Sequence, residues 1–218
     1  MSNIILTTTV NTKLNKEYLH QTNPEERVET YLKSIRQWLT KTNFNIIVVE
    51  NSGYIFEELD EEKDKYRDRF ECICFNEDDI EEADYLIGNS SKGSSEMFAI
   101  QYAFHNSTII QSNHFFIIKI TGRYFIPDFE EYINQYNLQE YDCLRQNDSS
   151  MCEIVGSTFN TFADIFSLRL LTESNEYYGH VEHVWKYRIS KCNNVFVLRT
   201  FFIEPTRRGG WDGFCYCL

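Results

Sequence analysis

The chain has 218 residues, of which 42% are hydrophobic and 16% aromatic, a composition that supplies a sizeable core and argues against global disorder. Its formal net charge of −12 argues against non-specific binding to nucleic acid or to an anionic membrane, because both need a dense basic surface. Any anionic ligand must therefore be held by a few cations placed close to it.

No linker rich in Pro, Gly or Ser divides the chain, so we expect a single domain over residues 1–218. The seven cysteines form no C-x-x-C pair and have no histidine pair nearby, which is typical neither of a disulfide framework nor of a structural zinc site. We therefore expect reduced thiols and a cytoplasmic location. No secretory signal is visible, and no apolar run approaches the ~20 residues that cross a bilayer, so we expect no membrane span.

The N-terminal part of the chain predicts a parallel strand, helix and strand unit. An apolar strand over 4–6 leads into the polar sequence TTTVN. Residues 27–41 carry apolar side chains at helical spacing, and residues 22–26 supply a cap, an early proline and acidic first-turn residues. A second apolar strand over 45–50, NIIVVE, ends in a turn at 51–53. This order predicts a right-handed parallel crossover, the opening unit of a doubly wound sheet.

The next segments continue this alternation. We predict a charged helix over 57–69, a third strand over 70–75 and an acidic loop into a short helix over 76–84. The turn over 92–96, KGSSE, precedes a helix that we expect to pack three apolar side chains inward: Met97, Ile100 and Phe104.

The most informative stretch is the run over 115–120, FFIIKI, which is apolar except for Lys119 and shows no alternation. Such a run predicts a strand covered on both faces and hence a central strand of an α/β sheet. It ends in the turn over 121–124, and Pro127 then precedes an acidic helix start. Ligands of open α/β sheets lie beyond the carboxyl ends of central strands, so we expect Lys119 and Arg123 at the rim of a site. The alternative is that both are ordinary surface charges at a strand end.

The later half predicts helices over 129–136, 159–171 and 181–189 and strands over 151–156 and 195–202. The expected fold is an α/β domain whose mostly parallel central sheet of about six or more strands is flanked by helices.

In this order the elements resemble the GT-A glycosyltransferases. The resemblance is carried by the first strand ending in TTTVN, the sequence NIIVVENSGY, the Lys-Gly turn before a helix, and the strand that runs into IPDFEEY. The chain is most similar to the small glycosyltransferases with which chlorella viruses and other large DNA viruses build capsid glycans. The resemblance implies transfer of a hexose or pentose from a nucleotide-sugar donor, with UDP favoured, to a hydroxyl of a glycan or glycoprotein acceptor, often with manganese.

The metal is the point where the chain departs from this family. In many GT-A enzymes the strand matching 116–120 ends in Asp-x-Asp, which holds a divalent cation against the diphosphate, whereas this chain reads KITGR over 119–123. The diphosphate carries about two negative charges to be offset as it leaves, by a metal or by cationic side chains. Lys119 and Arg123 are candidates for that replacement. Alternatively, carboxylates elsewhere in the chain hold the ion, and the acidic pair nearest in sequence is Asp78 and Asp79. That pair can also be a solvated acidic loop, so the metal ligands stay unassigned.

Strand ends and the resemblance together suggest the nucleotide site. The TTTVN segment offers hydroxyl and N–H groups, residues 50–51 offer acceptors for a ribose or base, and the helix start at Lys92 and Gly93 attracts phosphate. The candidate nucleotide-binding residues are Thr8, Thr9, Val10, Asn11, Glu50, Asn51, Lys92, Lys119 and Arg123. Simple strand termination and turn chemistry are the alternatives.

Glu182 is the candidate general base if the enzyme inverts the sugar configuration. It lies in GHVEHVW, which resembles the segment that opens a late helix in inverting GT-A enzymes. The alternative is a helix-start carboxylate favoured by the helix dipole. The candidate substrate-binding residues are Glu153, His183, Arg207 and Trp211, of which the last two lie in the glycine-containing loop over 204–212, a candidate lid.

Two other functions remain open from the sequence. A nucleotidyltransferase of similar α/β fold would use a nucleoside triphosphate, and a non-catalytic glycan-binding module would bind oligosaccharides through exposed aromatic side chains. Whether transfer would retain or invert the anomeric configuration is also open.

Overall fold

The structure, a computed structural model, describes residues 2–13, 15–168, 180–210 and 212–218. Its strands are β1 (Ser2–Thr8), β2 (Asn45–Glu50), β3 (Phe70–Cys74), β4 (Phe116–Thr121), β5 (Cys143–Arg145), β6 (Ile154–Ser157), β7 (Val195–Val197), β8 (Phe202–Arg207) and β9 (Phe214–Cys217). Its α-helices are α1 (Pro24–Lys41), α2 (Asp60–Lys65), α3 (Lys92–Asn106), α4 (Thr108–Asn113), α5 (Phe129–Ile133), α6 (Phe162–Phe166) and α7 (Val181–Ile189). Short 3₁₀ helices are η1 (Glu57–Leu59), η2 (Glu77–Asp79), η3 (Glu81–Leu86) and η4 (Leu138–Glu140).

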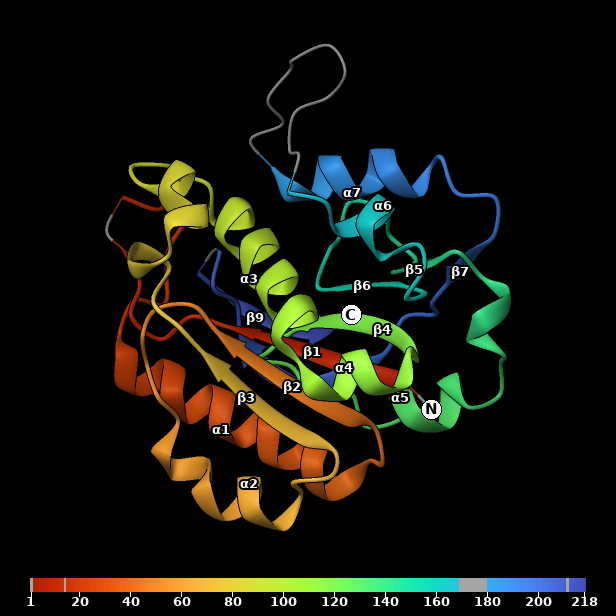
Figure 1. Cartoon of the computed structure of the whole chain (residues 1–218), viewed down its shortest axis with the longest axis horizontal. Helices are drawn as coiled ribbons and strands as arrows, with labels where there is room; N and C mark the ends of the chain where they lie inside the picture. The colour runs from red at the N-terminus through yellow and green to blue at the C-terminus, as the bar shows by residue number, and fades with distance from the viewer. Residues whose placement is uncertain (1, 14, 169–179, 211) are drawn as a thin grey trace.

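The central sheet has seven strands in the order β3-β2-β1-β4-β6-β5-β7 (Figure 1). β1 is parallel to both β2 and β4, and β2 is parallel to β3. β6 runs antiparallel to its neighbours β4 and β5, while β5 and β7 are parallel. The α/β class and the mostly parallel sheet predicted from the sequence are thus confirmed. The strand order changes direction between β1 and β4, the type of position where α/β sheets bind ligands.

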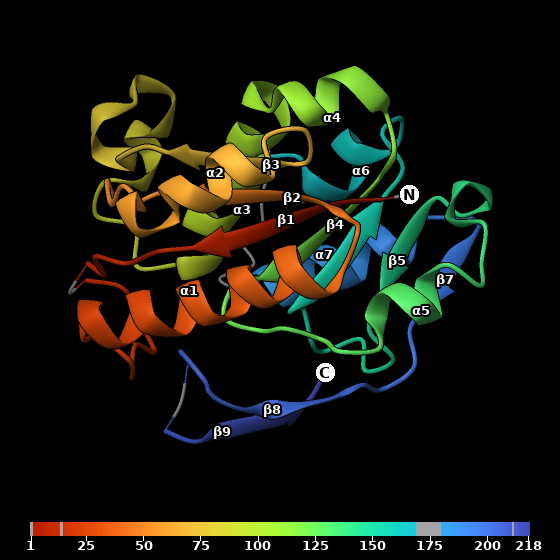
Figure 2. The same cartoon turned by 90° about the horizontal axis from the view of Figure 1, so that it is seen from below.

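Both faces of the sheet are covered, which explains the unbroken apolar strands. Ile4 and Leu6 belong to a core beneath α1 and α5, whereas Ile5 belongs to a second core beneath α3, α6 and α7. Successive side chains of a strand point to opposite faces, so a strand between two cores has no polar side. Figure 2 shows α1, α5 and the β8–β9 hairpin on one side of the sheet and α3 and α4 on the other.

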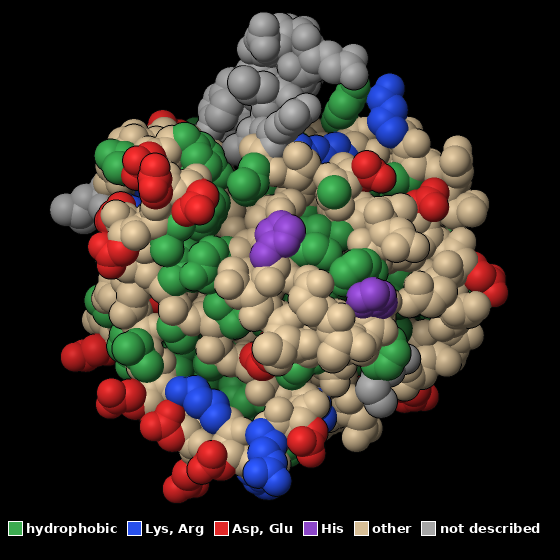
Figure 3. All heavy atoms as spheres, in the orientation of Figure 1, with side chains coloured by type: hydrophobic (Ala, Val, Ile, Leu, Met, Phe, Trp, Pro, Cys, Tyr) green, Lys and Arg blue, Asp and Glu red, His purple; other side chains and the backbone are tan. Residues whose placement is uncertain are grey.

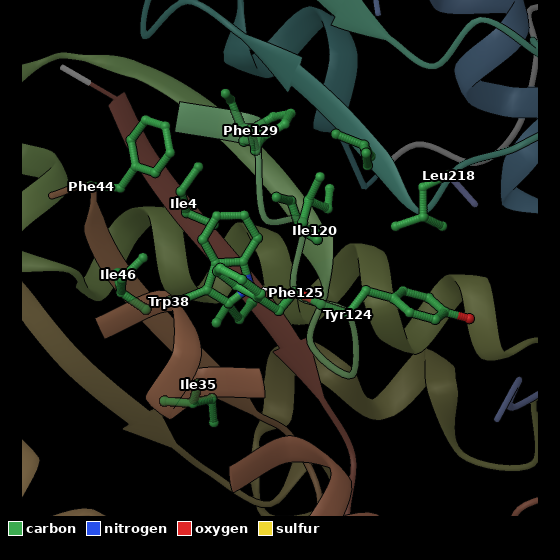
Figure 4. Packing of buried hydrophobic residues seen from close by; sticks show 14 of the residues in the cluster. Ile4, Ile35, Trp38, Phe44, Ile46, Ile120, Tyr124, Phe125, Phe129 and Leu218 are labelled. Carbon is green, nitrogen blue, oxygen red and sulfur yellow. Dashed lines mark hydrogen bonds between the residues drawn. The ribbon is translucent and has the colours of Figure 1, made fainter. Parts of the chain in front are cut away.

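The first core also fixes the turn after β4. The Trp38 indole N–H donates to the carbonyl oxygen of Tyr124 at 2.9 Å, and its ring meets that of Phe125 at 5.1 Å between centroids (Figure 4). Gly122 fits closely against β1, because a Cβ there would lie 2.7 Å from the Thr7 carbonyl oxygen. The end of β4 is therefore held against the end of β1.

Several predicted boundaries differ from the structure. The predicted strand over 195–202 is two strands in different sheets, since β7 ends at Val197 and β8 pairs with β9. The loop predicted over 204–212 begins inside β8, and the helix predicted over 57–69 is η1 followed by α2. β5 and β9 were not predicted, because strands of three or four residues are too short to show a period. Residues 169–171 of the predicted helix over 159–171 lie outside the described residues.

The surface agrees with the acidic composition. Figure 3 shows acidic side chains spread around the rim of one face, with fewer basic ones between them. None of the helices within the described residues has the length and apolar character needed to span a membrane.

Candidate active site

A cavity of about 440 Å³ lies at the carboxyl ends of β1, β2 and β4. Its wall contains the end of β1 with Thr8 and Thr9, the turn after β2, and the turn after β4 with Arg123. The first turns of α3 and α7 and residues 208–210 close its other sides. The cavity thus lies at the change of strand order, where the sequence places polar residues after each strand.

Four of the predicted nucleotide-binding residues line this cavity on the β1 and β2 side: Thr8, Thr9, Asn11 and Asn51. The Thr9 hydroxyl donates to the Asn51 side-chain oxygen at 2.6 Å, which ties the two strand ends together. The Thr8 hydroxyl donates to the Val49 carbonyl oxygen at 2.9 Å. These side chains offer a polar wall held by bonds between neighbouring strands.

Glu50 and Val10, also predicted here, lie behind that wall and are fully buried. The Glu50 carboxylate accepts from the backbone N–H of Val10 at 2.8 Å and from those of Ser52 and Tyr54, each at 2.9 Å. Burial raises the pKa of Glu50, and these hydrogen bonds oppose the rise by favouring its charged form. Within the structure Glu50 therefore orders the two loops, and its oxygens are occupied by the protein.

Three cations line the cavity without a carboxylate partner in the described part of the chain: Arg27, Lys92 and Arg123. Arg123 is 8% exposed and donates to the Gln21 side-chain oxygen at 2.7 Å. Arg27 is 4% exposed and donates through Nε to the Thr9 carbonyl oxygen at 2.6 Å. Neutral oxygens are thus the hydrogen-bond partners of both guanidinium groups, although the charge of Glu50 acts on Arg27 and partly opposes the lowering of its pKa by burial.

Lys92 adds to this charge at the start of α3. Its ammonium donates to the Tyr18 carbonyl oxygen at 2.7 Å. Burial and the charge of Arg123 lower the pKa of Lys92, as expected of a cation among cations. Gly93 brings the starts of α3 and α7 together, because a Cβ there would lie 2.6 Å from that of Val181.

Lys119 does not line the cavity, although its strand ends there. It is fully buried on the side of the second core, where its ammonium meets Glu96 Oε1 at 2.7 Å. The same group donates to the Cys152 carbonyl oxygen at 2.8 Å and to the Thr121 hydroxyl at 3.2 Å. An ammonium has three donors, so all of those of Lys119 are used inside the protein.

Two predicted carboxylates face the cavity from the opposite side. Glu153 Oε1 pairs with Arg208 at 3.0 Å, while the buried Oε2 has no hydrogen-bond partner among the described residues. Glu182 lies in the first turn of α7, half-buried, and makes no hydrogen bond or ion pair within the described ranges. Both side chains have acceptor capacity left for a ligand.

The remaining candidates lie elsewhere. His183 is exposed and Arg207 is exposed on β8, and neither lines the cavity. Trp211 lies outside the described residues. In their place His180 and Arg208 line the cavity, Arg208 coming from the loop over 204–212 that the sequence suggested as a lid. Arg27 was missed, because its helical position marks it only as part of a surface face.

The structure assigns no side chains to the manganese ion that the resemblance implies. No three His, Cys, Asp or Glu side chains come together as a metal-binding group among them. Asp78, one of the acidic pair suggested from the sequence, forms an ion pair with Lys13 at 2.6 Å. Glu77, which lines the cavity, accepts from Lys13 at 2.8 Å and from Asn51 at 3.0 Å.

Comparison with known proteins finds no matching family model and no matching curated protein. Among solved structures, a candidate nucleotide-diphospho-sugar transferase from Desulfovibrio desulfuricans G20 is 14% identical, with 91% of this chain and 79% of that chain covered and a TM-score of 0.49. S. aureus TarS is 12% identical over 90% of this chain and 57% of its own, with a TM-score of 0.49. Galactosyltransferase LgtC with donor and acceptor sugar analogues is 8% identical over 89% and 72%, with a TM-score of 0.49. The resemblance to viral capsid-glycan enzymes stays a prediction.

Proposed function

We propose that this chain is a glycosyltransferase that moves a sugar from a nucleoside diphosphate donor, with UDP favoured, to a hydroxyl of a glycan. The observation that carries the proposal is the cluster of Arg27, Lys92 and Arg123 in a cavity at the change of strand order. In a chain with a net charge of −12, cations gathered without carboxylate partners favour an anionic ligand.

The cluster suits a diphosphate better than a single charge. Arg123 follows β4 and Lys92 begins α3, and each lies beside one of two consecutive glycines, Gly209 and Gly210, so two phosphate groups can be met by different cations. The start of α3 adds the partial positive charge of a helix N-terminus. These fixed charges also offset the charge that develops on the leaving diphosphate, which is how electrostatic catalysis lowers a barrier.

The polar wall and the carboxylates suit the rest of the donor. Thr8, Thr9, Asn11 and Asn51 provide hydroxyl and amide groups for a nucleoside. The unpartnered oxygen of Glu153 is an acceptor for a sugar hydroxyl.

Glu182 completes the proposed mechanism if the reaction inverts. Its carboxylate takes the proton of the acceptor hydroxyl while the acceptor oxygen bonds to the anomeric carbon. The bond from that carbon to the diphosphate breaks, and its electron pair leaves with the nucleoside diphosphate. A positioned base of this kind typically contributes about 10²- to 10⁴-fold in rate.

Thermal unfolding with UDP, GDP or CMP, each with and without manganese, tests the donor assignment. A ligand that binds only the folded state stabilises it by about 2.7 kcal/mol at a hundred times its Kd, so one nucleotide should raise the Tm clearly. Stabilisation by UDP only with manganese would refute charge compensation by side chains alone. If no nucleotide raised the Tm while oligosaccharides did, a glycan-binding module would replace the enzyme.

Glu182→Gln tests the base. It should keep the Tm increase caused by UDP and lose transfer by about 10²-fold or more, because only proton transfer is removed. Asp164→Asn, which makes the same change on the exposed side of α6, is the matched control and should behave as the wild type. A fully active Glu182→Gln variant would remove Glu182 from the role.

A further inference from the structure

The β8–β9 hairpin is a two-stranded sheet separate from the central sheet, and β9 is its open edge. Figure 2 shows the hairpin at the margin of the molecule with β9 outermost. On one side β9 pairs with β8, and on its other side no strand among the described residues pairs with it. Ile203, Cys215 and Leu218 tie the hairpin to the first core. A two-stranded sheet is only marginally stable by itself, so a further strand on the open edge would stabilise it.

The pairing of the hairpin shows which backbone groups face the open edge. Phe201 and Leu218 exchange both backbone hydrogen bonds, at 2.7 and 2.9 Å, so Leu218 directs its N–H and carbonyl groups toward β8. In an antiparallel pair these groups alternate in direction along the strand, so those of Cys217 and Cys215 point away from β8. The Cys217 carbonyl oxygen accepts from the Cys215 thiol at 3.1 Å and has a second lone pair. The open edge therefore presents two residues that can pair with another strand.

β9 also lacks the features that keep strand edges apart in native proteins. These features are charged side chains, prolines and bulges. β8 contains Glu204, Pro205 and Arg207, and its register with β9 shifts between Phe202 and Thr206. β9 has the sequence FCYC, with no charge and no proline. Of the two strands, the outer one is therefore the unprotected one.

We propose that β9 pairs with β9 of a second copy of this chain, which forms a two-fold symmetric dimer through a four-stranded antiparallel sheet. A two-fold axis can place a strand antiparallel to its own copy, so one edge serves both partners. Cys215 of one protomer and Cys217 of its partner then exchange the hydrogen bonds. The two Tyr216 side chains face each other across the axis, in a pair without mutual hydrogen bonds.

Exposed aromatic side chains on the hairpin add the area that a short strand lacks. Phe202 is 85% exposed, Tyr216 61% and Phe214 47%. A stable interface buries about 1,000 Å² or more, and a fully buried aromatic side chain contributes roughly 150–250 Å². Three such side chains from each copy therefore supply a large part of that area. Charge does not oppose the contact, because residues 195–218 carry three arginines against one glutamate and one aspartate, in a chain whose net charge is −12.

Sedimentation of the full chain, from micromolar to several hundred micromolar concentration, tests the dimer. We expect a reversible shift from the monomer mass to twice that mass. Tyr216→Asp should weaken the dimer tenfold or more, because like charges directly opposite each other in a sheet repel. Ile55→Asp is the matched control, since Ile55 is 63% exposed and lies outside the hairpin, and it should dimerise as the wild type does. At a concentration where the wild type is monomeric, both variants should have its Tm, which excludes a folding defect.

A cross-link tests the pairing without relying on a loss of binding. Cβ atoms of residues that face each other without mutual hydrogen bonds lie close enough for a disulfide. With Cys217→Ser present to remove the exposed native thiol, Tyr216→Cys should join two copies on treatment with oxidised glutathione, whereas Ile55→Cys should not. The proposal is overturned if the wild type stays monomeric at every concentration, because β9 then pairs with no second copy. It is also overturned if Tyr216→Asp dimerises as well as the wild type, or if a dimeric Tyr216→Cys variant forms no cross-link.

Discussion

The buried ion pair between Lys119 and Glu96 offers the sharpest test of how this site is built. Lys119 is fully buried, and the Glu96 side chain is 22% exposed, with 2.7 Å between the ammonium and Oε1. We predict that Lys119→Met and Glu96→Gln each destabilise the protein, because each leaves a charged or polar partner behind without its counterpart. Measured losses for such broken pairs are about 3–5 kcal/mol, and the partial exposure of Glu96 places this pair near 3 kcal/mol.

A loss of that size is large for a domain whose total stability is about 5–15 kcal/mol. It corresponds to a Tm lower by roughly 6–12 °C for a chain of this length. The double variant should cost less than either single one, since removing both charges also removes the cost of burying them. Lys33→Met is the control, because both side chains of its pair with Glu204 are exposed, and breaking it should cost about 0–1 kcal/mol.

Urea unfolding at pH 7 measures these differences. Burial disfavours the charged form of Lys119, but Glu96 outweighs it and the pKa is raised above the ordinary 10.5. Because the folded-state pKa is the higher one, the contribution of protonated Lys119 is fully present at pH 7 and is lost as the pH rises above 10.5 through the folded-state value. Single losses below 1 kcal/mol, or losses that simply add in the double variant, would refute the reasoning. If Lys119→Met folds but no longer responds to UDP while Glu96→Gln still does, Lys119 binds phosphate after all.

Three other predictions concern the surroundings of the site. Gly209→Ala should weaken stabilisation by UDP, because the new Cβ would lie 2.6 Å from the Arg123 guanidinium. Gly210→Ala should not weaken it, because the nearest atom to its new Cβ is 3.5 Å away. Equal UDP responses of the two variants would contradict this prediction. Trp38→Phe should lower the free energy of unfolding in urea by about 1–3 kcal/mol and weaken the UDP response, because the Tyr124 carbonyl beside Arg123 loses its hydrogen-bond donor. An unchanged free energy of unfolding would show that this hydrogen bond is dispensable. Asn23→Ala should lower the free energy of unfolding by about 1 kcal/mol in the same assay, because the Asn23 side chain caps α1. An unchanged free energy of unfolding would mean that the cap does not stabilise the protein.

Local sequence signals predicted most of the framework. The strand over 45–50 and the helix over 181–189 have the predicted bounds, and Asn23 caps α1 as the cap signal indicated. The apolar run over 115–120 predicted a strand buried on both faces, which β4 is. Such features depend on residues that are close together in the sequence, so the periodicity of apolar residues reveals them. The polar ends of β1 and β2 also predicted one wall of the cavity, because parallel strands end at the same edge.

The roles of the charged side chains were decided by the tertiary structure. Sequence position made Lys119 and Arg123 look equivalent, yet Arg123 lines the cavity while Lys119 is fully buried in an ion pair with Glu96. The difference comes from Glu96 on α3, which supplies the ion-pair partner of Lys119. Arg27 likewise reaches the site only because α1 packs across β1. A sequence determines which residues can form a strand or a helix, whereas a buried charge takes its role from partners that are distant in the chain and adjacent only after folding.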